Sequence, residues 1–434
     1  MNRTAKKSIL LIGADKHVLR ACGELSVDVT VVYGRSAKEF GLHPIAPEVT
    51  QLFVEDQHSV EAILSALVRA GIDGRAFDSV YTSDEGAIVT ASALALHFGI
   101  RSMAMDTAIN FRDKAVQKSI LRAAGIPVAD YRVVDDISEL REDFDLPFSE
   151  AVIKPVAGAG ASATAKVCST SELLRFAEKF RPGGSPERSF VLEEFMPGQE
   201  WQINGVVHDG HVVFMSVSTY GETCLTALTG NRPMRVSVLD PVVDSWAYER
   251  SASLVQESLR ALGLESGVFH MELFYDRDSD RLVFGECAAR RGGAITQEEV
   301  AYKFGVSLAA CAVQSALGEV PDIRQQVRPG SVGSVFLPVV PGTLFACPTV
   351  EELQDLPDVR FARIDLPIGF RMSKSLGSTL IKAGQVMIHA ESDESVEKRI
   401  EYVLDWFLSR IIAIPHDASP AELRSWSEGL ASAI

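Results

Sequence analysis

Short apolar runs alternate with amphipathic stretches along the first hundred residues. Runs of strand-like length stand at 8–13, 29–34 and 77–83, and apolar side chains recur at helical spacing in 59–71 and 85–99. This alternation predicts βαβ units and a parallel sheet in an α/β fold. Only Gly13 marks the first strand-to-helix turn, so the G-x-G-x-x-G dinucleotide fingerprint is absent. An NAD-dependent enzyme therefore has little support.

The pattern changes twice further along the chain. After Asp113 a polar amphipathic helix is predicted, ending at Gly125, and segments rich in strands and turns follow it. The proline-bounded stretch 321–329 separates these segments from a last region, in which short strands precede a predicted helix at 392–411. We therefore expect three regions, separated by changes of pattern at Asp113 and at 321–329.

Composition narrows the classes of function. The chain has 434 residues, 47% of them hydrophobic, and a net charge of −16, which disfavours nucleic acid as a partner. Its six cysteines are scattered without a C-x-x-C pair, as is typical of reduced thiols in a cytoplasm. Neither a signal peptide nor an apolar run of membrane-spanning length is found. We expect a cytoplasmic protein without a membrane partner.

A lysine before a glycine-rich loop is the first candidate for chemistry. Lys154 ends a predicted strand, the small residues of 157–164 follow, and 165–168 predicts a return strand. Because the lysine precedes the glycines and no helix follows, the segment is neither a Walker loop nor a Rossmann turn. Gly158 and Gly160 would let backbone N–H groups approach an anion, under a flap that closes. A surface hairpin with a solvated lysine explains the pattern equally well.

Two apolar runs around the polar turn 276–280 predict a β-hairpin. A turn symmetric about Ser279 would place Glu272 opposite Glu286 and His270 opposite Ala288. The other face would then carry the core side chains Met271, Leu273, Val283 and Cys287.

Opposed carboxylates on this hairpin imply a cation between them. Their Cβ atoms would lie about 4.5–5.5 Å apart, and Mg²⁺ suits two oxygen donors with waters and phosphates completing its shell. Alternatively, both glutamates face water or pair with Arg290 and Arg291. These arginines precede Gly292 and Gly293 and a helix predicted near Thr296, a combination that favours an anion. A further segment, 190–205, brackets apolar residues with carboxylates and can accept a flat base and ribose hydroxyls.

Taken in this order, the segments resemble the ATP-grasp superfamily of carboxylate–amine ligases, and within it the L-amino-acid and dipeptide ligase group. The resemblance implies an N-terminal βαβ domain (1–107), a central ATP-grasp domain of two α+β subdomains (108–320) and a small C-terminal α+β domain (321–434). Residues 130–195 would form a mobile lid subdomain that carries the glycine-rich flap.

The resemblance also implies a set of site residues. The nucleotide would be bound by Lys114, Lys154, Gly158, Gly160, Ala161, Ser162, Glu193, Glu194, Met196 and Glu200. The metal ligands would be Glu272 and Glu286, and the catalytic residues Arg290 and His270. Many members have an asparagine ligand where this chain has Ala288, so metal binding would depend more on the two glutamates. A hydrogen-bonded structural role for His270 is the alternative.

The implied activity is ATP-dependent amide bond formation between a carboxylate, that of an amino acid, and an amine, through an acyl phosphate. ATP and Mg²⁺ are the expected cofactors, with Mn²⁺ as an alternative ion, and the partners are small-molecule substrates and a second copy of the chain in a homodimer. Two alternatives stay open: a purine-pathway or carboxylase-type ATP-grasp ligase, and a non-catalytic ATP-binding module.

Overall fold

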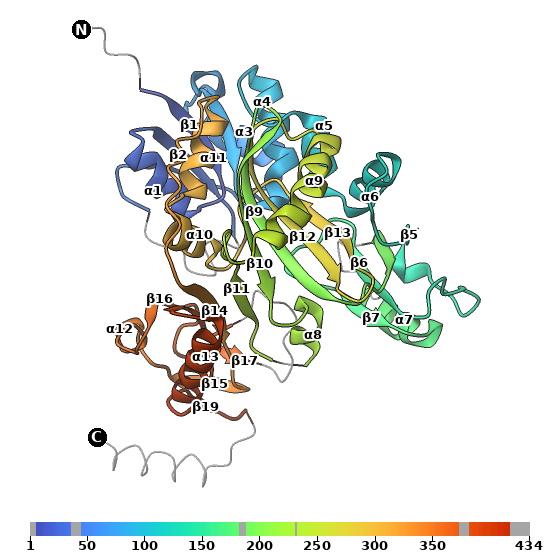
Figure 1. Ribbon diagram of the computed structural model, residues 1–434. Coiled ribbons are helices and arrows are strands. Elements are labelled where there is room, and N and C mark those ends of the chain that lie inside the picture. The colour runs from blue at the N-terminus through green and yellow to red at the C-terminus, as the bar shows by residue number, and fades with distance from the viewer. Residues whose placement is uncertain (1–5, 36–44, 182–187, 231, 373–381, 417–434) are drawn as a thin grey trace. The chain divides into compact units, whose positions relative to one another are not determined.

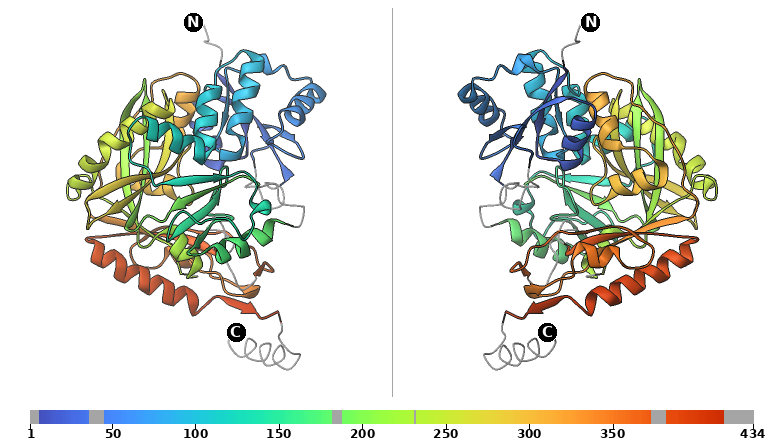
Figure 2. Two further views of the ribbon diagram at one scale, coloured as in Figure 1. Left: turned by 90° about the vertical axis from the view of Figure 1, so that its right-hand side faces the viewer. Right: turned by 90° about the vertical axis from the view of Figure 1, so that its left-hand side faces the viewer.

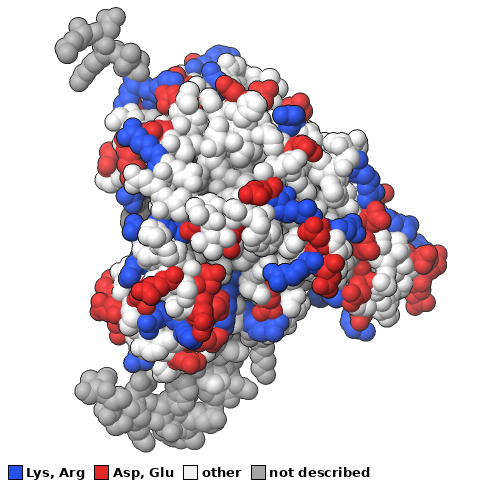
Figure 3. All heavy atoms as spheres, viewed as in Figure 1, with Lys and Arg blue, Asp and Glu red and all other residues white. Residues whose placement is uncertain are grey.

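The computed structural model describes residues 6–35, 45–181, 188–230, 232–372 and 382–416, which divide between two compact units. The first unit comprises 1–159, 164–218 and 240–328, and the second 160–163, 219–239 and 329–434. Among the described helices, none combines the length and the apolar character that a membrane span requires. On the face shown in Figure 3, basic and acidic side chains are interspersed, and no broad area carries basic side chains alone.

A parallel sheet opens the first unit, as the apolar pattern predicts. Its strand order is β3-β2-β1-β4, with β1 (Ser8–Ile12), β2 (Asp28–Tyr33), β3 (Thr50–Phe53) and β4 (Ser79–Thr82). Successive side chains of each strand point to opposite faces of the sheet. Leu10 and Ile12 pack toward helices α3 (Val60–Ala70) and α4 (Ile88–Phe98), whereas Ile9 and Leu11 pack toward α1 (Lys16–Glu24) and α11 (Leu308–Ala316) (Figures 1 and 2). Helices on both faces bury this sheet and leave its carboxyl edge for polar residues.

Two helices and a small antiparallel sheet follow. Helix α5 (Met105–Arg112) ends at Asp113, whose carboxylate caps α6 (Lys114–Ala123) by accepting the N–H groups of Ala115 and Val116. The sheet has the order β5-β8-β6-β7, formed by β5 (Tyr131–Val134), β6 (Ala151–Pro155), β7 (Ala165–Val167) and β8 (Phe190–Glu194). Helix α7 (Thr170–Ala177) brings Phe176 to within 6.0 Å of the Phe190 ring centroid. The hairpin predicted on both sides of the glycine-rich loop is thus confirmed as β6 and β7.

Longer strands supply the rest of the first unit. The order is β13-β12-β9-β10, with β9 (Gln199–His208), β10 (His211–Tyr220), β12 (Gly267–Asp276) and β13 (Arg281–Ala288). Strand β12 is antiparallel to both β9 and β13, and the fully buried Trp201 and Phe269 belong to its core. Helices α9 (Ser245–Leu262) and α10 (Thr296–Phe304) complete this part.

The second unit is a separate α+β body. One group of strands has the order β11-β14-β18-β16, formed by β11 (Arg235–Val238), β14 (Ser331–Leu337), β16 (Val359–Ile364) and β18 (Gly384–Ala390). A second group has the order β17-β15-β19, formed by β15 (Gly342–Ala346), β17 (Arg371–Met372) and β19 (Ile412–Ile414). The helices are α8 (Cys224–Thr229), α12 (Val350–Gln354) and α13 (Asp393–Leu408).

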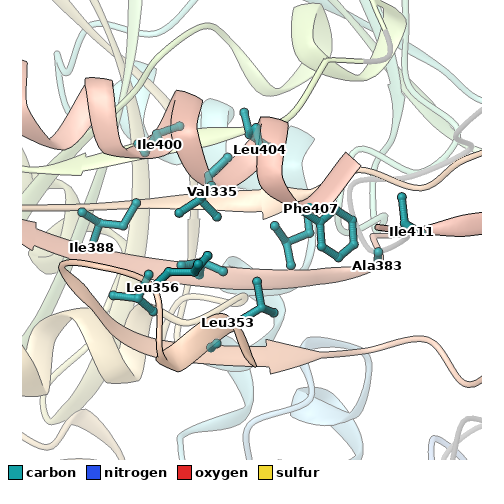
Figure 4. Packing of buried hydrophobic residues seen from close by; sticks show 14 of the residues in the cluster. Val335, Leu353, Leu356, Ala383, Ile388, Ile400, Leu404, Phe407 and Ile411 are labelled. Atoms are coloured by element: carbon teal, nitrogen blue, oxygen red, sulfur yellow. The ribbon is translucent and has the colours of Figure 1, made fainter. Parts of the chain in front are cut away.

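Helix α13 supplies the core of this second unit. Ile400, Leu404 and Phe407 recur at helical spacing and face Val335 and Ile388 of the strands (Figure 4). Burial of this apolar stripe explains why the pattern at 392–411 predicts the helix correctly.

Candidate active site

Helix α6 holds strand β13 through three side chains. Lys114, Gln117 and Lys118 share one helix face because they are three and four residues apart. The Lys118 ammonium donates to the Gly285 carbonyl at 3.2 Å, and that of Lys114 lies 3.6 Å from Glu286 Oε2. The Gln117 amide exchanges two hydrogen bonds with the backbone of the next residue, Cys287, at 2.6 and 3.0 Å. Three consecutive residues of β13 are thereby fixed against one helix.

The hairpin β12–β13 brings two carboxylates face to face. Glu272 pairs with Glu286 and His270 with Ala288, so the predicted register of these pairs is confirmed. The predicted turn centre at Ser279 is wrong, because Asp276 pairs with Arg281. An extra, unpaired residue in β13 compensates for this difference.

That extra residue is Gly285, a β-bulge. Glu272 pairs with Glu286, while the next residue, Leu273, pairs with Phe284. A Cβ atom at Gly285 would lie 2.9 Å from the Glu272 carbonyl oxygen, which explains the glycine. The bulge also corrects the predicted core face: Phe284 stands beside Leu273, and Val283 pairs with Phe274 instead.

Lysines and glutamates alternate behind the opposed carboxylates. Lys154 Nζ lies 3.2 Å from Glu193 Oε1 and 3.5 Å from Glu286 Oε2. The other oxygen of Glu193 lies 3.2 Å from Lys118 Nζ. Glu193 and Lys118 are buried, and Lys154 is only half-buried, so the chain Lys118–Glu193–Lys154–Glu286 runs from the interior to the surface of the site.

The pKa shifts follow from this alternation. Burial would raise the pKa of Glu286, but the ammonium groups of Lys114 and Lys154 hold it at about 2. Burial would lower the pKa of Lys154, yet Glu193 and Glu286 raise it above its usual value. At Lys118 burial prevails over the attraction of Glu193, and the pKa is lowered. Glu286 is therefore an anion and Lys154 a cation at neutral pH.

His270 is held by an amide from the neighbouring strand. Its Nδ1 lies 2.9 Å from Asn204 Oδ1, which also accepts the Gly292 N–H at 3.2 Å, so Nδ1 is the donor in this network. Its Nε2 lies 3.4 Å from Glu272 Oε1. Asn204 thus fixes the histidine beside the first of the opposed carboxylates.

The two arginines after β13 contact the carboxyl edge of the parallel sheet. Arg290 donates through Nε and Nη2 to Glu85, at 3.1 and 2.5 Å, and Arg291 Nη2 lies 2.6 Å from Asp15. The pairing with Glu272 or Glu286 that the sequence left open is not found among the described ion pairs. Burial would lower the pKa of Arg290, but Glu85 raises it. Ligands of open α/β sheets bind at this edge.

No family model matches the chain. It is 24% identical to the L-arginine-specific L-amino acid ligase of Bacillus subtilis, over 73% of this chain and 74% of that protein. It is 30% identical to the D-alanine–D-alanine ligase of Acidiphilium cryptum, over 45% of this chain and 61% of that protein.

Solved structures give the fold. The L-amino acid ligase from Bacillus licheniformis superposes with a TM-score of 0.76 at 22% identity, covering 94% of this chain and 99% of that one. Carboxyaminoimidazole ribonucleotide synthase from Aspergillus clavatus, complexed with ATP, gives 0.67 at 16% identity, with 92% and 98% covered. The chain has the ATP-grasp fold.

Most residues that the ATP-grasp resemblance implies lie in the first unit. Lys114, Lys154, Glu193, Glu272 and Glu286 converge through the contacts above, and His270 joins them through Glu272. Arg290 comes two residues after the end of β13 and pairs with Glu85 instead.

The remaining predicted residues lie in two loops. Lys114 Nζ donates to the Gly158 carbonyl at 2.7 Å, whereas Gly160, Ala161 and Ser162 group with the second unit. Glu194 ends β8 exposed, Met196 is half-buried, and Glu200 is buried on β9. A nucleotide role for both loops stays a prediction.

The sequence alone missed several residues around this candidate site: Asp15, Glu85, Gln117, Lys118 and Asn204. Two of them had a usable signal, because Asp15 follows β1 and Glu85 follows β4, where parallel strands end. Lys118 had a weaker one, its spacing of four from Lys114. Asn204 had none, since its role depends on the pairing of β9 with β12.

Proposed function

We propose that this chain is an ATP-dependent ligase that joins the carboxylate of an amino acid to an amine, releasing ADP and phosphate. The observation that carries the proposal is the position of Glu286. It lies opposite Glu272 across the strands and within 3.6 Å of both Lys114 and Lys154. A pair of carboxylates for a divalent ion beside two ammonium groups for phosphates is what binding of a nucleoside triphosphate requires.

The donor set fits Mg²⁺, with Mn²⁺ as the alternative ion. Glu272 and Glu286 offer carboxylate oxygens from adjacent strands, both side chains are partly exposed, and the pKa of Glu286 is held at about 2, so that it is ionised. Mg²⁺ prefers one or two carboxylates and takes its other ligands from waters and phosphates. When bound, the ion would neutralise phosphate charge during transfer. Ala288 contributes no ligand, which leaves this task to the two glutamates.

The nucleotide would extend from these lysines toward β8. Lys114 and Lys154 would bind phosphates, and backbone groups of the loop with Gly158, Gly160, Ala161 and Ser162 would cover them and exclude water. Glu194 and Met196 would accept the adenine, and Glu200 the ribose. Glu193, whose two oxygens lie 3.2 Å from Lys118 and Lys154, would act on the nucleotide through Lys154. The three-domain division at 107 and 320, with the lid at 130–195, belongs to this proposal.

The reaction has two steps. An oxygen of the substrate carboxylate attacks the γ-phosphorus, the bond to the β-phosphate oxygen breaks, and an acyl phosphate and ADP form. The amine nitrogen then attacks the acyl carbon, loses a proton, and expels phosphate. Arg290 would stabilise the oxyanion of this second step, and His270, held by Asn204, would orient the carboxylate or carry the proton.

The substrate class follows from the relatives. Amino acid ligases from two Bacillus species match this chain over most of its length. The arginine specificity in the name of the Bacillus subtilis ligase is a property of that enzyme and is not part of our proposal. We infer small-molecule substrates, a homodimer and a cytoplasmic location for this chain.

A screen of amino acids in pairs for ATP-dependent phosphate release tests the proposal. Phosphate release and a dipeptide that need two amino acids are expected. Release with nucleotide precursors or bicarbonate would instead indicate the purine-pathway or carboxylase type. Nucleotide binding without turnover over the whole panel would indicate a non-catalytic module.

A further inference from the structure

Lys118 occupies an unusual environment for a lysine outside the predicted site. Its side chain is fully buried, and its ammonium lies 3.2 Å from Glu193 Oε2 and 3.2 Å from the Gly285 carbonyl oxygen. A charge in such a place is costly unless it is paired and hydrogen-bonded. Both partners of Lys118 are themselves next to residues of the candidate active site.

The first partner, Glu193, determines what Lys154 can do. Glu193 has one oxygen toward Lys118 and the other toward Lys154, at the same distance of 3.2 Å. Without Lys118, the buried carboxylate of Glu193 would have only the Lys154 ammonium to neutralise it among the described ion pairs. Lys154 would then be drawn to Glu193, and less of its charge would be available to a phosphate.

The second partner, Gly285, determines where Glu286 points. Gly285 is the bulge residue, and the register on its far side places Glu286 opposite Glu272. The hydrogen bond from Lys118 holds the carbonyl of that residue. One ammonium therefore contacts both Glu193, the neighbour of Lys154, and strand β13, which carries Glu286.

We propose that Lys118 is a positioning residue of the nucleotide site: it neutralises Glu193 so that Lys154 is left for the phosphates of a nucleoside triphosphate. It acts through Glu193 and Gly285 and does not touch the substrate. This role rests on the proposed function and adds to it a residue that the reaction itself does not use.

The chain contains a matched control in Lys303. This side chain is also fully buried, lies 2.6 Å from Asp240 Oδ2, and donates to the Arg328 carbonyl at 2.8 Å. Neither partner belongs to the candidate site. Lys118→Met and Lys303→Met therefore remove the same kind of buried ion pair, one at the site and one away from it.

The experiment is calorimetric titration of the full-length chain with AMP-PNP and MgCl2, without amino acids. Wild type and Lys303→Met are expected to bind AMP-PNP with the same Kd. The Kd of Lys118→Met is expected to be at least about tenfold higher, the change that loss of one interaction of modest strength produces. Circular dichroism checks that the variants are folded. Equal affinities of Lys118→Met and Lys303→Met would overturn the role of Lys118 and leave the proposed function intact, whereas a wild type that does not bind would overturn both.

A double variant separates positioning from general damage. In Lys118→Met/Glu193→Gln the uncompensated carboxylate is gone, so Lys154 is free for phosphate and the protein has no unpaired buried charge to prevent folding. The double variant is expected to bind AMP-PNP more tightly than Lys118→Met alone. Affinity equal to or lower than that of the single variant would contradict the proposal. If Lys118→Met only damaged the structure, Glu193→Gln would not restore binding and its own cost would add to that of the first substitution.

Discussion

At the scale of single residues, the neighbours of Glu286 determine its charge and its use. Two lysines within 3.6 Å keep this carboxylate ionised, although burial alone would raise its pKa. The same lysines are the groups that we expect to meet phosphates. The negative charge of Glu286 can therefore attract a cation directly, and it holds in place the two lysines that we expect to bind an anion. Removing this charge tests both roles.

Replacement of Glu286 by glutamine tests the metal assignment. The amide keeps the shape but loses the negative charge, so we expect phosphate release to fall by at least about a hundredfold, on the order of 3 kcal/mol of lost stabilisation. A coupled assay for ADP measures this effect, and circular dichroism checks the fold. Full activity in Glu286→Gln would remove this residue from the metal site.

Acid should destabilise the protein partly through the same carboxylate. The folded-state pKa of Glu286, about 2, lies below its ordinary value of 4.5, so its ionised form stabilises the fold above pH 4.5, and this contribution is lost as pH falls toward 2. Urea unfolding between pH 6 and pH 3 is expected to show a steeper loss for wild type than for Glu286→Gln. Parallel pH profiles of the two proteins would contradict the pKa shift.

Arg290 offers a test that is independent of the metal. Its guanidinium donates two hydrogen bonds to Glu85, and these bonds fix its orientation. Arg290→Lys keeps the charge and loses the fork, so we expect kcat to fall by about a hundredfold while AMP-PNP binding changes little. Loss of nucleotide affinity in place of turnover would assign this residue to nucleotide binding instead.

At the scale of elements, the β12–β13 hairpin shows what the sequence can and cannot predict. Alternation and turn residues predicted the hairpin and the Glu272–Glu286 pair, since strand periodicity is local. The bulge at Gly285 was not predicted, because it depends on contacts with Glu272 across the hairpin and with α6. The predicted pair was right because a shorter turn and the bulge offset each other.

Gly285→Ala should disturb this element. The new Cβ would lie 2.9 Å from the Glu272 carbonyl oxygen, so the strand must shift or the bulge must move, at a cost of about 1–3 kcal/mol. Gly23→Ala in helix α1 is the control, because nothing lies within 4 Å of its Cβ position, and it should stabilise by about 0.5–1 kcal/mol. Chemical denaturation measures both, and a neutral Gly285→Ala would mean that the bulge tolerates a side chain.

At the scale of the whole chain, prediction succeeded where one segment is self-sufficient and failed where distant segments meet. The parallel sheet and helix α13 followed from apolar periodicity within single segments. Ion pairs such as Arg290–Glu85 join residues 205 positions apart, and no local pattern specifies such a pair. The order of the motifs along the chain predicted the ATP-grasp fold correctly, whereas no single motif was specific enough to do so.

The division into two units has its own consequence for stability. Phe407 is fully buried in the core of the second unit, so Phe407→Ala should cost about 3–5 kcal/mol there. Residues 240–328, which include β12 and β13, form their contacts within the first unit, and their hydrogen exchange is expected to stay near that of wild type. Exchange measured by mass spectrometry on peptides from α13 and from β13 checks both. Equal acceleration in the two peptides would mean that the units unfold together, since opening of one would then require opening of the other.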